Sequence, residues 1–287
     1  MRSIKYLIVV LFLFQYSSAI CQIDKTDWEG AYPEGCTSIT AGKDATLDGS
    51  VITSHTDDSH RTRSWMDIQP AMDHENNSMA PLYKRMSCDT FAMPIYTHEK
   101  IGEIPQKRHT YAYINTAYPC MNEKQLAIGE STFGGRECLQ SDEGLIDCQR
   151  LCRLMLERCS TAREAILLAG SLMKKYGWND AGECLTIADP NEVWHLEIVG
   201  PGKGNIGAVW VAQRVPDDHI AVNANASTIK EIDLNDEDFF LASDNVFTMA
   251  KDSGWWKAGT EEFRFCYAYA PHRDRKSTRL NSSHFVP

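Results

Sequence analysis

The sequence predicts an α+β layered domain, in which strand pairs precede and follow a helical region. Three observations favour this class. Two runs rich in β-branched residues lie within residues 36–56, two segments with helical apolar spacing lie within residues 146–177, and four strand patterns follow within residues 182–225. The sequence contains no internal repeat, and its length allows one large domain with a sizeable core.

The first residues are typical of an export signal. Arg2 and Lys5 supply positive charge, the run YLIVVLFLF is too short to span a bilayer comfortably, and small residues end at Ala19. We therefore expect residues 1–19 to be a signal peptide. The mature protein should then be secreted or periplasmic, with no membrane contact after the signal has been removed.

The segments on either side of the expected domain have their own character. Residues 20–35 are polar and poor in core residues, which is typical of a linker or a pro-segment. Residues 273–287 have no apolar periodicity, and their composition departs from the aromatic-rich segment before them. This tail fits a disordered extension, or a non-native sequence that follows a reading frame ending near His272. The domain should therefore occupy residues 36–272.

The net charge of −10 disfavours nucleic acid and anionic membranes as partners. The ten cysteines include no CxxC pair, and no two histidines have zinc-finger spacing, so we expect no structural metal and no cofactor. An exported chain can form disulfides. If Cys21 and Cys36 are unpaired, the eight remaining cysteines fit four bridges, whose pairing the sequence leaves open.

A hairpin opens the domain. Its strands are the runs CTSITAG and SVITSHT, which begin at Cys36 and Ser50 and are joined by a turn with an Asp-Gly pair. Residues 60–110 are less regular, since a polar loop and three prolines interrupt them. The segment HTYAYINTAYPCMNEKQLAIGEST then predicts two strands around a turn at Asn122–Glu123.

Helices are expected next. Residues 146–157 have helical apolar spacing, and Thr161 forms a capping box with Glu164 before AILLAGSLMKKYG, which Gly177 ends. Four antiparallel strands follow, in the runs ECLTIAD, EVWHLEI, GAVWVAQRV and HIAVNAN. A last helix is expected over residues 236–251.

Cys36 heads the first strand and admits three interpretations. It could be a disulfide partner or a small buried apolar residue. It could also be a nucleophile exposed by cleavage of the Gly35–Cys36 bond. The new α-amine, whose ordinary pKa is roughly 8, could then accept the thiol proton. One residue would supply both nucleophile and base.

Five stretches resemble, in the same order, the dipeptidase family of N-terminal-nucleophile cysteine hydrolases, that is, the dipeptidase A and secernin group. They are CTSITAGKDATLDGSVITSHTDD, MNEKQLAIGEST, WHLEIVG, GAVWVAQRVPDDHIAVNANASTI and ASDNVFTMAKDSGWW. Penicillin V acylase and bile salt hydrolase are more distant relatives. The resemblance implies a four-layer αββα sandwich. Because family members continue past the point at which this chain stops, it also implies an amino-terminal fragment, incomplete at its C-terminus.

The resemblance also implies roles for single residues. Cys36 matches the nucleophile, and Asp58 matches an Asp that contacts the nucleophile's amine, although the neighbouring Asp57 leaves this register open by one residue. Asn225 and a group near Asn122 match the donors to the oxyanion. Each has an ordinary alternative, since the aspartates could form a solvated turn, Asn122 a plain turn, and Asn225 a strand-end cap.

Two further residues are candidates for substrate binding. His55 lies where many relatives have a basic side chain, often Arg, and Glu130 begins a segment that could line a pocket or form only a loop. The function implied is that of an exported cysteine dipeptidase, which processes itself at Cys36, acts on small peptides and needs no metal. The alternatives are an acylase for penicillin- or bile-salt-type amides and a non-enzymatic, disulfide-stapled extracellular binding domain.

Overall fold

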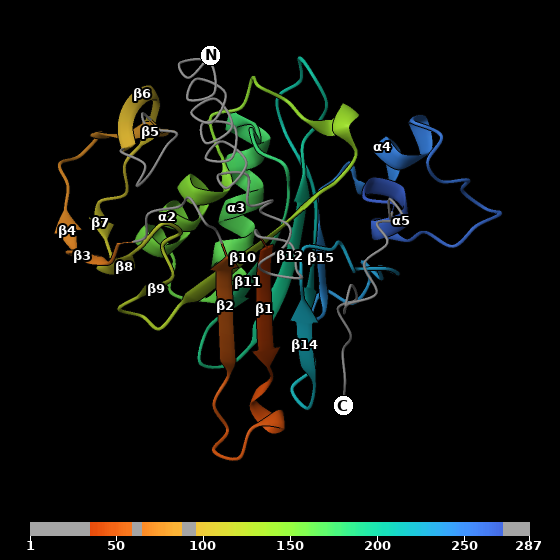
Figure 1. Cartoon of the computed structure of the whole chain (residues 1–287), viewed down its shortest axis with the longest axis horizontal. Coiled ribbons are helices and arrows are strands. Elements are labelled where there is room, and N and C mark those ends of the chain that lie inside the picture. Colours follow the sequence, from red (N-terminus) through yellow and green to blue (C-terminus); the bar gives the residue numbers. More distant parts are fainter. Residues whose placement is uncertain (1–34, 59–64, 88–95, 272–287) are drawn as a thin grey trace, which may run out of the picture. The chain divides into compact units, whose positions relative to one another are not determined.

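The computed structural model describes residues 35–58, 65–87 and 96–271. The predicted signal peptide, the linker up to residue 34 and the tail over residues 273–287 lie outside these ranges, as do Cys21 and Cys88. Within them the protein combines α-helices with mainly antiparallel β-sheets, as the sequence predicts (Figure 1).

The predicted hairpin forms two strands of a small sheet. Strand β1 (Gly35–Ala41) pairs with β2 (Ile52–Asp58) on one side and with β14 (Ile220–Asn223) on the other, all antiparallel (Figure 1). A short 3-10 helix, η1 (Lys43–Ala45), lies in the turn. Gly42 precedes it, and a Cβ there would lie 2.4 Å from the carbonyl oxygen of Asp217, so the two loops meet only because this residue is glycine.

A larger sheet carries the core. Its eight strands follow the order β15-β13-β12-β11-β10-β9-β8-β3. The four central strands are β10 (Ala127–Gly134), β11 (Gly182–Ala188), β12 (Val193–Val199) and β13 (Val209–Arg214). The outer strands are β3 (Asp67–Gln69), β8 (Tyr113–Asn115), β9 (Met121–Asn122) and β15 (Phe240–Ala242). All residues of β11 and β12 are buried, which indicates that both faces of the sheet are covered.

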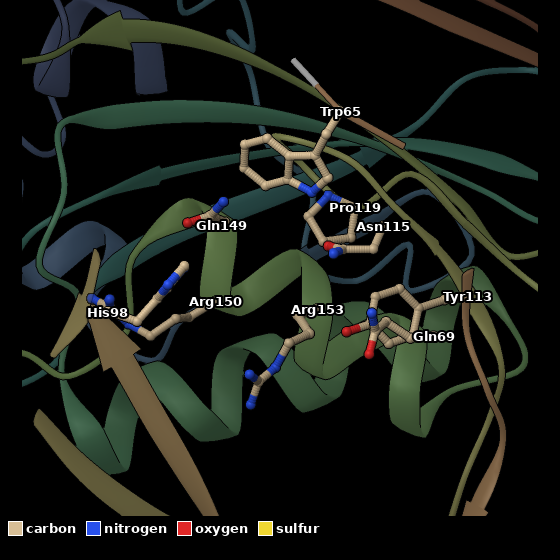
Figure 2. A pocket seen from close by; sticks show the side chains of 9 residues that line it. All are labelled: Trp65, Gln69, His98, Tyr113, Asn115, Pro119, Gln149, Arg150 and Arg153. Carbon is tan, nitrogen blue, oxygen red and sulfur yellow. The ribbon is translucent and has the colours of Figure 1, made fainter. Parts of the chain in front are cut away.

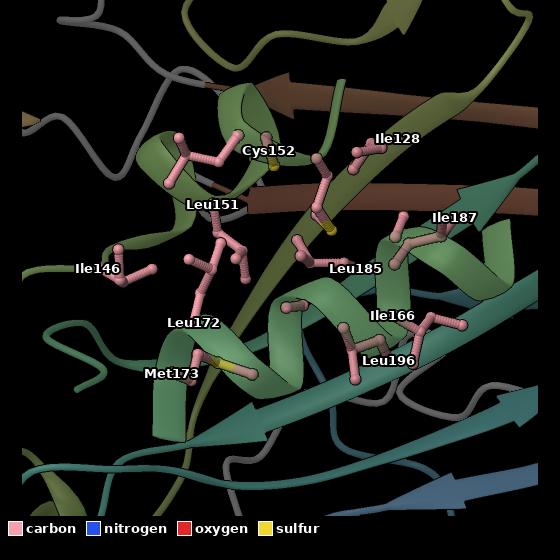
Figure 3. Packing of buried hydrophobic residues seen from close by; sticks show 14 of the residues in the cluster. Ile128, Ile146, Leu151, Cys152, Ile166, Leu172, Met173, Leu185, Ile187 and Leu196 are labelled. Carbon is pink, nitrogen blue, oxygen red and sulfur yellow. The ribbon is translucent and has the colours of Figure 1, made fainter. Parts of the chain in front are cut away.

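Two helices cover one face of this sheet. Helix α2 (Cys148–Arg158) starts two residues later than predicted, after the N-cap Asp147, and α3 (Ala162–Tyr176) starts at the predicted cap Thr161. The Thr161 hydroxyl accepts a hydrogen bond from the Glu164 amide, and Gly177 ends α3 with a φ of 76°. Figure 3 shows apolar side chains of both helices facing those of the sheet strands, namely Leu151, Ile166, Leu172, Met173, Leu185 and Leu196.

The small sheet covers the opposite face. Thr53 and Thr186 share a hydrogen bond of 3.0 Å between the two sheets, and Thr40 shares one of 3.1 Å with His195. The outer face of the small sheet carries three isoleucines that are 42–46% exposed, Ile39, Ile52 and Ile220. The described ranges are therefore compatible with a layered sandwich.

Two segments differ from the prediction. Residues 60–110, expected to be irregular, contain a long ribbon of β5 (Met79–Ser87) and β6 (Tyr96–Pro105), and a short pair of β4 (Met72–Asp73) and β7 (His109–Thr110). Pro81 is tolerated because a two-stranded ribbon leaves each strand with a free edge.

The last predicted helix is also different. It is short, α4 (Val246–Asp252), because residues 240–242 pair with β13 instead, and tertiary pairing overrides the local helical pattern. Helix α5 (Phe265–Tyr269) follows, and a second short 3-10 helix, η2 (Glu137–Leu139), follows β10. Trp255 and Trp256 pack partly buried against the cluster around α4 and α5. Across the described residues, no helix is both long enough and apolar enough to cross a membrane.

The cysteines do not form the four predicted bridges. All eight that lie in the described ranges are free thiols, and five of them are buried. Cys148 and Cys152 lie one turn apart on α2, with their thiols hydrogen bonded inside the core. These residues behave as small apolar core side chains.

Candidate active site

Cys36 lies at the start of β1, and its backbone nitrogen has a specific partner. It donates a hydrogen bond of 2.7 Å to Oδ1 of Asn225. Asn225 Nδ2 donates to the Thr132 carbonyl at 2.6 Å, and the Asn225 amide donates to the Ser131 hydroxyl at 2.8 Å. Asn225 has a φ of 53°, a conformation that asparagine tolerates better than most residues. The structure therefore brings Asn225 to Cys36, where its side-chain oxygen accepts from the backbone nitrogen.

Two carboxyl groups surround the Cys36 sulfur. Sγ lies 3.5 Å from Oε1 of Glu130, and the donor atoms of Cys36, Asp57 and Glu130 lie within 4.8 Å of one another. Asp57 is the cross-strand partner of Cys36, whereas Asp58 is the partner of Gly35 and accepts a hydrogen bond from Thr56. Because side chains alternate along a strand, the structure brings Asp57 to the thiol and not the matched Asp58, within the one-residue range that the sequence left open.

The surroundings of the Cys36 thiol favour its neutral form. Burial raises the pKa of Cys36 far above its ordinary value, and the charges of Glu130 and Asp57 raise it further, while the Thr132 amide acts in the opposite direction. Burial, and then the charge of Asp57, raises the pKa of Glu130 to about 7. Burial also raises the pKa of Asp57.

His55 lies two residues before Asp57 on β2, so both side chains face the large sheet. A Cβ on Gly129 would lie 3.0 Å from the Cβ of His55 and 2.7 Å from the Thr186 hydroxyl, so this close approach requires a glycine. Burial lowers the pKa of His55, which favours a neutral ring at physiological pH. His55 therefore flanks the Cys36 group from the same face of β2.

Asn122 lies elsewhere. Its Nδ2 donates to the carbonyls of Leu156 and Cys159, both at 2.8 Å, and its Oδ1 accepts from the amides of Lys124 and Leu126. Both amide hydrogens are used, so the side chain has no donor left for an oxyanion. Asn122 ties the turn after β9 to the end of α2, which is the structural alternative stated for it.

A second buried group adjoins the first. The donor atoms of Glu130, Cys148 and Glu183 lie within 4.8 Å of one another, and Glu183 Oε1 accepts a hydrogen bond of 2.6 Å from the Thr132 hydroxyl. Proximity of this kind does not define a metal site, because buried carboxyl groups and thiols can hold protons instead. Sequence reasoning missed Thr132 and Glu183. The available indication was an acidic residue at the start of a strand that is otherwise almost wholly apolar.

A pocket of about 210 Å³ lies against α2, away from these residues (Figure 2). Its lining residues are Trp65, Gln69, His98, Tyr113, Asn115, Pro119, Gln149, Arg150 and Arg153. Both arginines already have acidic partners on their own helix or at its cap, since Arg150 pairs with Asp147 and Arg153 with Glu157. None of the lining residues belongs to the group around Cys36.

Comparisons with known proteins identify relatives of this chain. Residues 35–284 match the model of peptidase family C69. A probable dipeptidase of Latilactobacillus sakei is 30% identical over 84% of this chain and 50% of its own length. A probable dipeptidase B of Lactococcus lactis is 27% identical, over 73% of this chain and 43% of its own length. A probable dipeptidase A of Streptococcus pyogenes is 26% identical, over 84% and 50%.

The chain thus spans about half the length of the curated relatives it matches. The family match begins at Gly35, one residue before the thiol that the structure surrounds with Asn225, Asp57 and Glu130. It covers well over half of the chain, and the chain belongs to peptidase family C69.

Proposed function

We propose that this protein is a cysteine dipeptidase whose nucleophile is Cys36, set free by cleavage of the Gly35–Cys36 bond. The observation that carries the proposal is that Asn225 holds the Cys36 nitrogen at 2.7 Å while the thiol of the same residue faces Glu130. Relatives named as probable dipeptidases support a dipeptide substrate. The free state of the described cysteines argues against the disulfide-stapled binding domain.

Cleavage changes the chemistry of the site. In the intact chain the Cys36 nitrogen belongs to an amide and has no basic lone pair, and the pKa of the thiol is raised. After cleavage the nitrogen is an amine with an ordinary pKa of roughly 8. The amine takes the thiol proton, and the resulting ammonium is stabilised by Asn225 Oδ1 and by the Asp57 carboxylate. The ammonium in turn lowers the pKa of the adjacent thiol.

The thiolate then attacks the carbonyl carbon of the dipeptide. Asn225 Nδ2 has two hydrogens, of which one is bound by the Thr132 carbonyl, so the second is available to the oxyanion. The ammonium returns its proton to the leaving amine, and a thioester remains on Cys36. Water hydrolyses the thioester and restores the thiol. No step requires a metal.

The charge of the site suits a small peptide. Asp57 and Glu130 provide negative charge beside the thiol, which favours the α-ammonium group of an unblocked dipeptide, and neutral His55 lies next to them. An acylase for non-peptide amides would not need this charge. The fold that we infer for the complete enzyme is the four-layer αββα sandwich of N-terminal-nucleophile hydrolases, and the first 19 residues support export to a secreted or periplasmic location.

Amino-terminal sequencing and intact-mass measurement of the exported protein test the proposal. We expect a mature chain that begins at Cys36 and cleaves dipeptides in preference to acylated amino acids, penicillin V and bile-salt amides. Cys36→Ala should remain uncleaved and inactive, whereas Cys36→Ser should keep some turnover because a hydroxyl is a weaker nucleophile. An active protein that retains the residues before Cys36, or full activity of Cys36→Ala, would exclude this mechanism.

A further inference from the structure

Glu130 and Glu183 lie on the neighbouring strands β10 and β11 and form a buried carboxyl pair. Thr132 is the cross-strand partner of Glu183, and Glu130 is the partner of Leu185, so both glutamates lie on the face of the sheet that α2 covers. Glu130 is 2% exposed and Glu183 3%. A carboxyl group buried at this position is stable only if it accepts a hydrogen bond, lies beside a cation or holds a proton.

The hydrogen bonds of the pair are incomplete for two ionised groups. Glu183 Oε1 accepts from the Thr132 hydroxyl, and Glu130 Oε1 accepts from the Cys36 thiol. The second oxygen of each carboxyl, Oε2, is buried and has no donor. Two such oxygens in one small space repel each other when both groups are ionised, whereas one proton turns the contact into an O–H···O hydrogen bond.

The charges around the two glutamates also favour retention of a proton. Beyond the effect of burial, the charges of Asp57 on β2 and Asp180 before β11 raise the pKa of Glu130, and Asp180 and Cys152 on α2 raise that of Glu183. The hydrogen bond from the Cys36 thiol on β1 lowers the pKa of Glu130, and Tyr118 before β9 and Cys148 on α2 also face the pair. A second full negative charge in this setting would be strongly disfavoured.

We propose that Glu183 is a positioning residue that stays protonated and donates a hydrogen bond to Glu130, so that the pair holds one proton beside the nucleophile. The inference rests on Cys36 being the nucleophile of the proposed function. Burial first, and then the charge of Glu130, raises the pKa of Glu183 well above its ordinary value. The hydrogen bond orients Glu130 toward the thiol. Glu183 also holds the hydroxyl of Thr132, whose carbonyl binds Asn225.

The rate at which iodoacetamide alkylates Cys36 reports the state of Glu130. Ionised Glu130 raises the pKa of the thiol, so the rise of the alkylation rate with pH should flatten around the pKa of Glu130, near pH 7. The measurement uses the processed full chain and follows the Cys36 peptide by mass spectrometry between about pH 5.5 and 9. Exposed Cys138 in the same sample serves as the reference for the reagent. Glu130→Gln should remove the flattening.

Two substitutions of Glu183 show whether this residue is protonated or ionised in the wild-type protein. Glu183→Gln keeps a donor and mimics the protonated acid. The midpoint pH of the flattening in the alkylation rate should therefore stay within about half a pH unit of the wild-type value. Glu183→Met removes the donor, and the midpoint should rise by about one pH unit, because ionised Glu130 loses a hydrogen bond. A midpoint that falls by more than half a unit in Glu183→Gln would show that Glu183 is ionised in wild type and overturn the proposal. An unchanged midpoint in Glu183→Met would overturn it as well.

Thermal unfolding establishes that each variant is folded. If Glu183→Met does not fold, carboxyl carbon NMR of the wild-type protein decides the matter. One buried glutamate should titrate near pH 7 and the other should stay protonated to a clearly higher pH. Completion of both titrations below pH 6 would refute the shared proton. Alkylation and NMR need no turnover, so an inactive protein would count against the proposed dipeptidase and leave this result standing.

Discussion

Removal of the Asn225 side chain should affect both stability and catalysis. Its amide joins the Cys36 nitrogen to the Thr132 carbonyl with hydrogen bonds of 2.7 and 2.6 Å, and its backbone has a φ of 53°. Asn225→Ala removes both bonds and places an alanine in a left-handed conformation. Asn225→Gly removes the same bonds but relieves the backbone, so it is the matched control.

The expected loss of stability can be worked from these terms. Both hydrogen bonds are open to solvent, so each contributes about 0.5 kcal/mol, at the low end of the usual range. An alanine in the left-handed region costs about 1 kcal/mol more. Asn225→Ala should therefore destabilise the protein by about 2 kcal/mol, or lower its Tm by roughly 4–8 °C. The glycine variant should be the more stable of the two by a few tenths of a kcal/mol or more.

Catalysis should suffer more than stability. Without the side chain the Cys36 amine is no longer fixed beside its thiol, and the oxyanion loses a donor, so kcat/KM for dipeptides should fall by about 10²–10³ in both variants. The assay is dipeptide hydrolysis at a temperature well below either Tm, with the mature amino terminus verified by mass. A rate within threefold of wild type would refute the role given to Asn225. Loss of stability with an unchanged rate would show that the amide only anchors the loop.

Two further predictions concern stability. Burial lowers the pKa of His195 from an ordinary 6.5 to about 4, so its contribution to stability is complete above pH 6.5 and is lost as the pH falls to 4. The loss is at most about 3 kcal/mol, and His195→Gln should remove it from urea-unfolding curves measured across that interval. Gly170→Ala on α3 would place a Cβ 2.5 Å from the Trp210 ring, so it should destabilise by about 1–3 kcal/mol despite the better helix propensity of alanine, whereas neighbouring Ser171→Ala should not. A stabilised Gly170→Ala would contradict this packing.

Local patterns predicted the elements that depend on local chemistry. The hairpin at Cys36, the capping box at Thr161 and the glycine end of α3 are confirmed, because turn residues, caps and left-handed glycines act within a few residues. The β5–β6 ribbon and the pairing of β15 with β13 were not predictable in this way. Both depend on partners distant in the chain, and the prolines in and around the ribbon are a misleading local indication.

The same distinction between local patterns and contacts of distant segments applies to the candidate site. Cys36 and Asn225 could be found from the sequence, since each lies in a motif that resembles a known family. The contact of Glu130 with Glu183 could not be predicted from the sequence. It depends on the register of β10 and β11, whose partners Thr132 and Glu183 are 51 residues apart along the chain. The choice between Asp57 and Asp58 was left open for the same reason, as a shift of one residue reverses the faces of a strand.

That choice is decided at some distance from Cys36. Thr53, His55 and Asp57 alternate along one face of β2, and the first of them is fixed by its hydrogen bond to Thr186 of the large sheet. The close approach of His55 to Gly129 holds the next position. With these two contacts in place, Asp57 has to face the large sheet and the Cys36 thiol, and Asp58 has to face away. The charge beside the Cys36 thiol is therefore set by the packing of two sheets, and a bulky residue at position 129 should disturb the site without touching the sulfur.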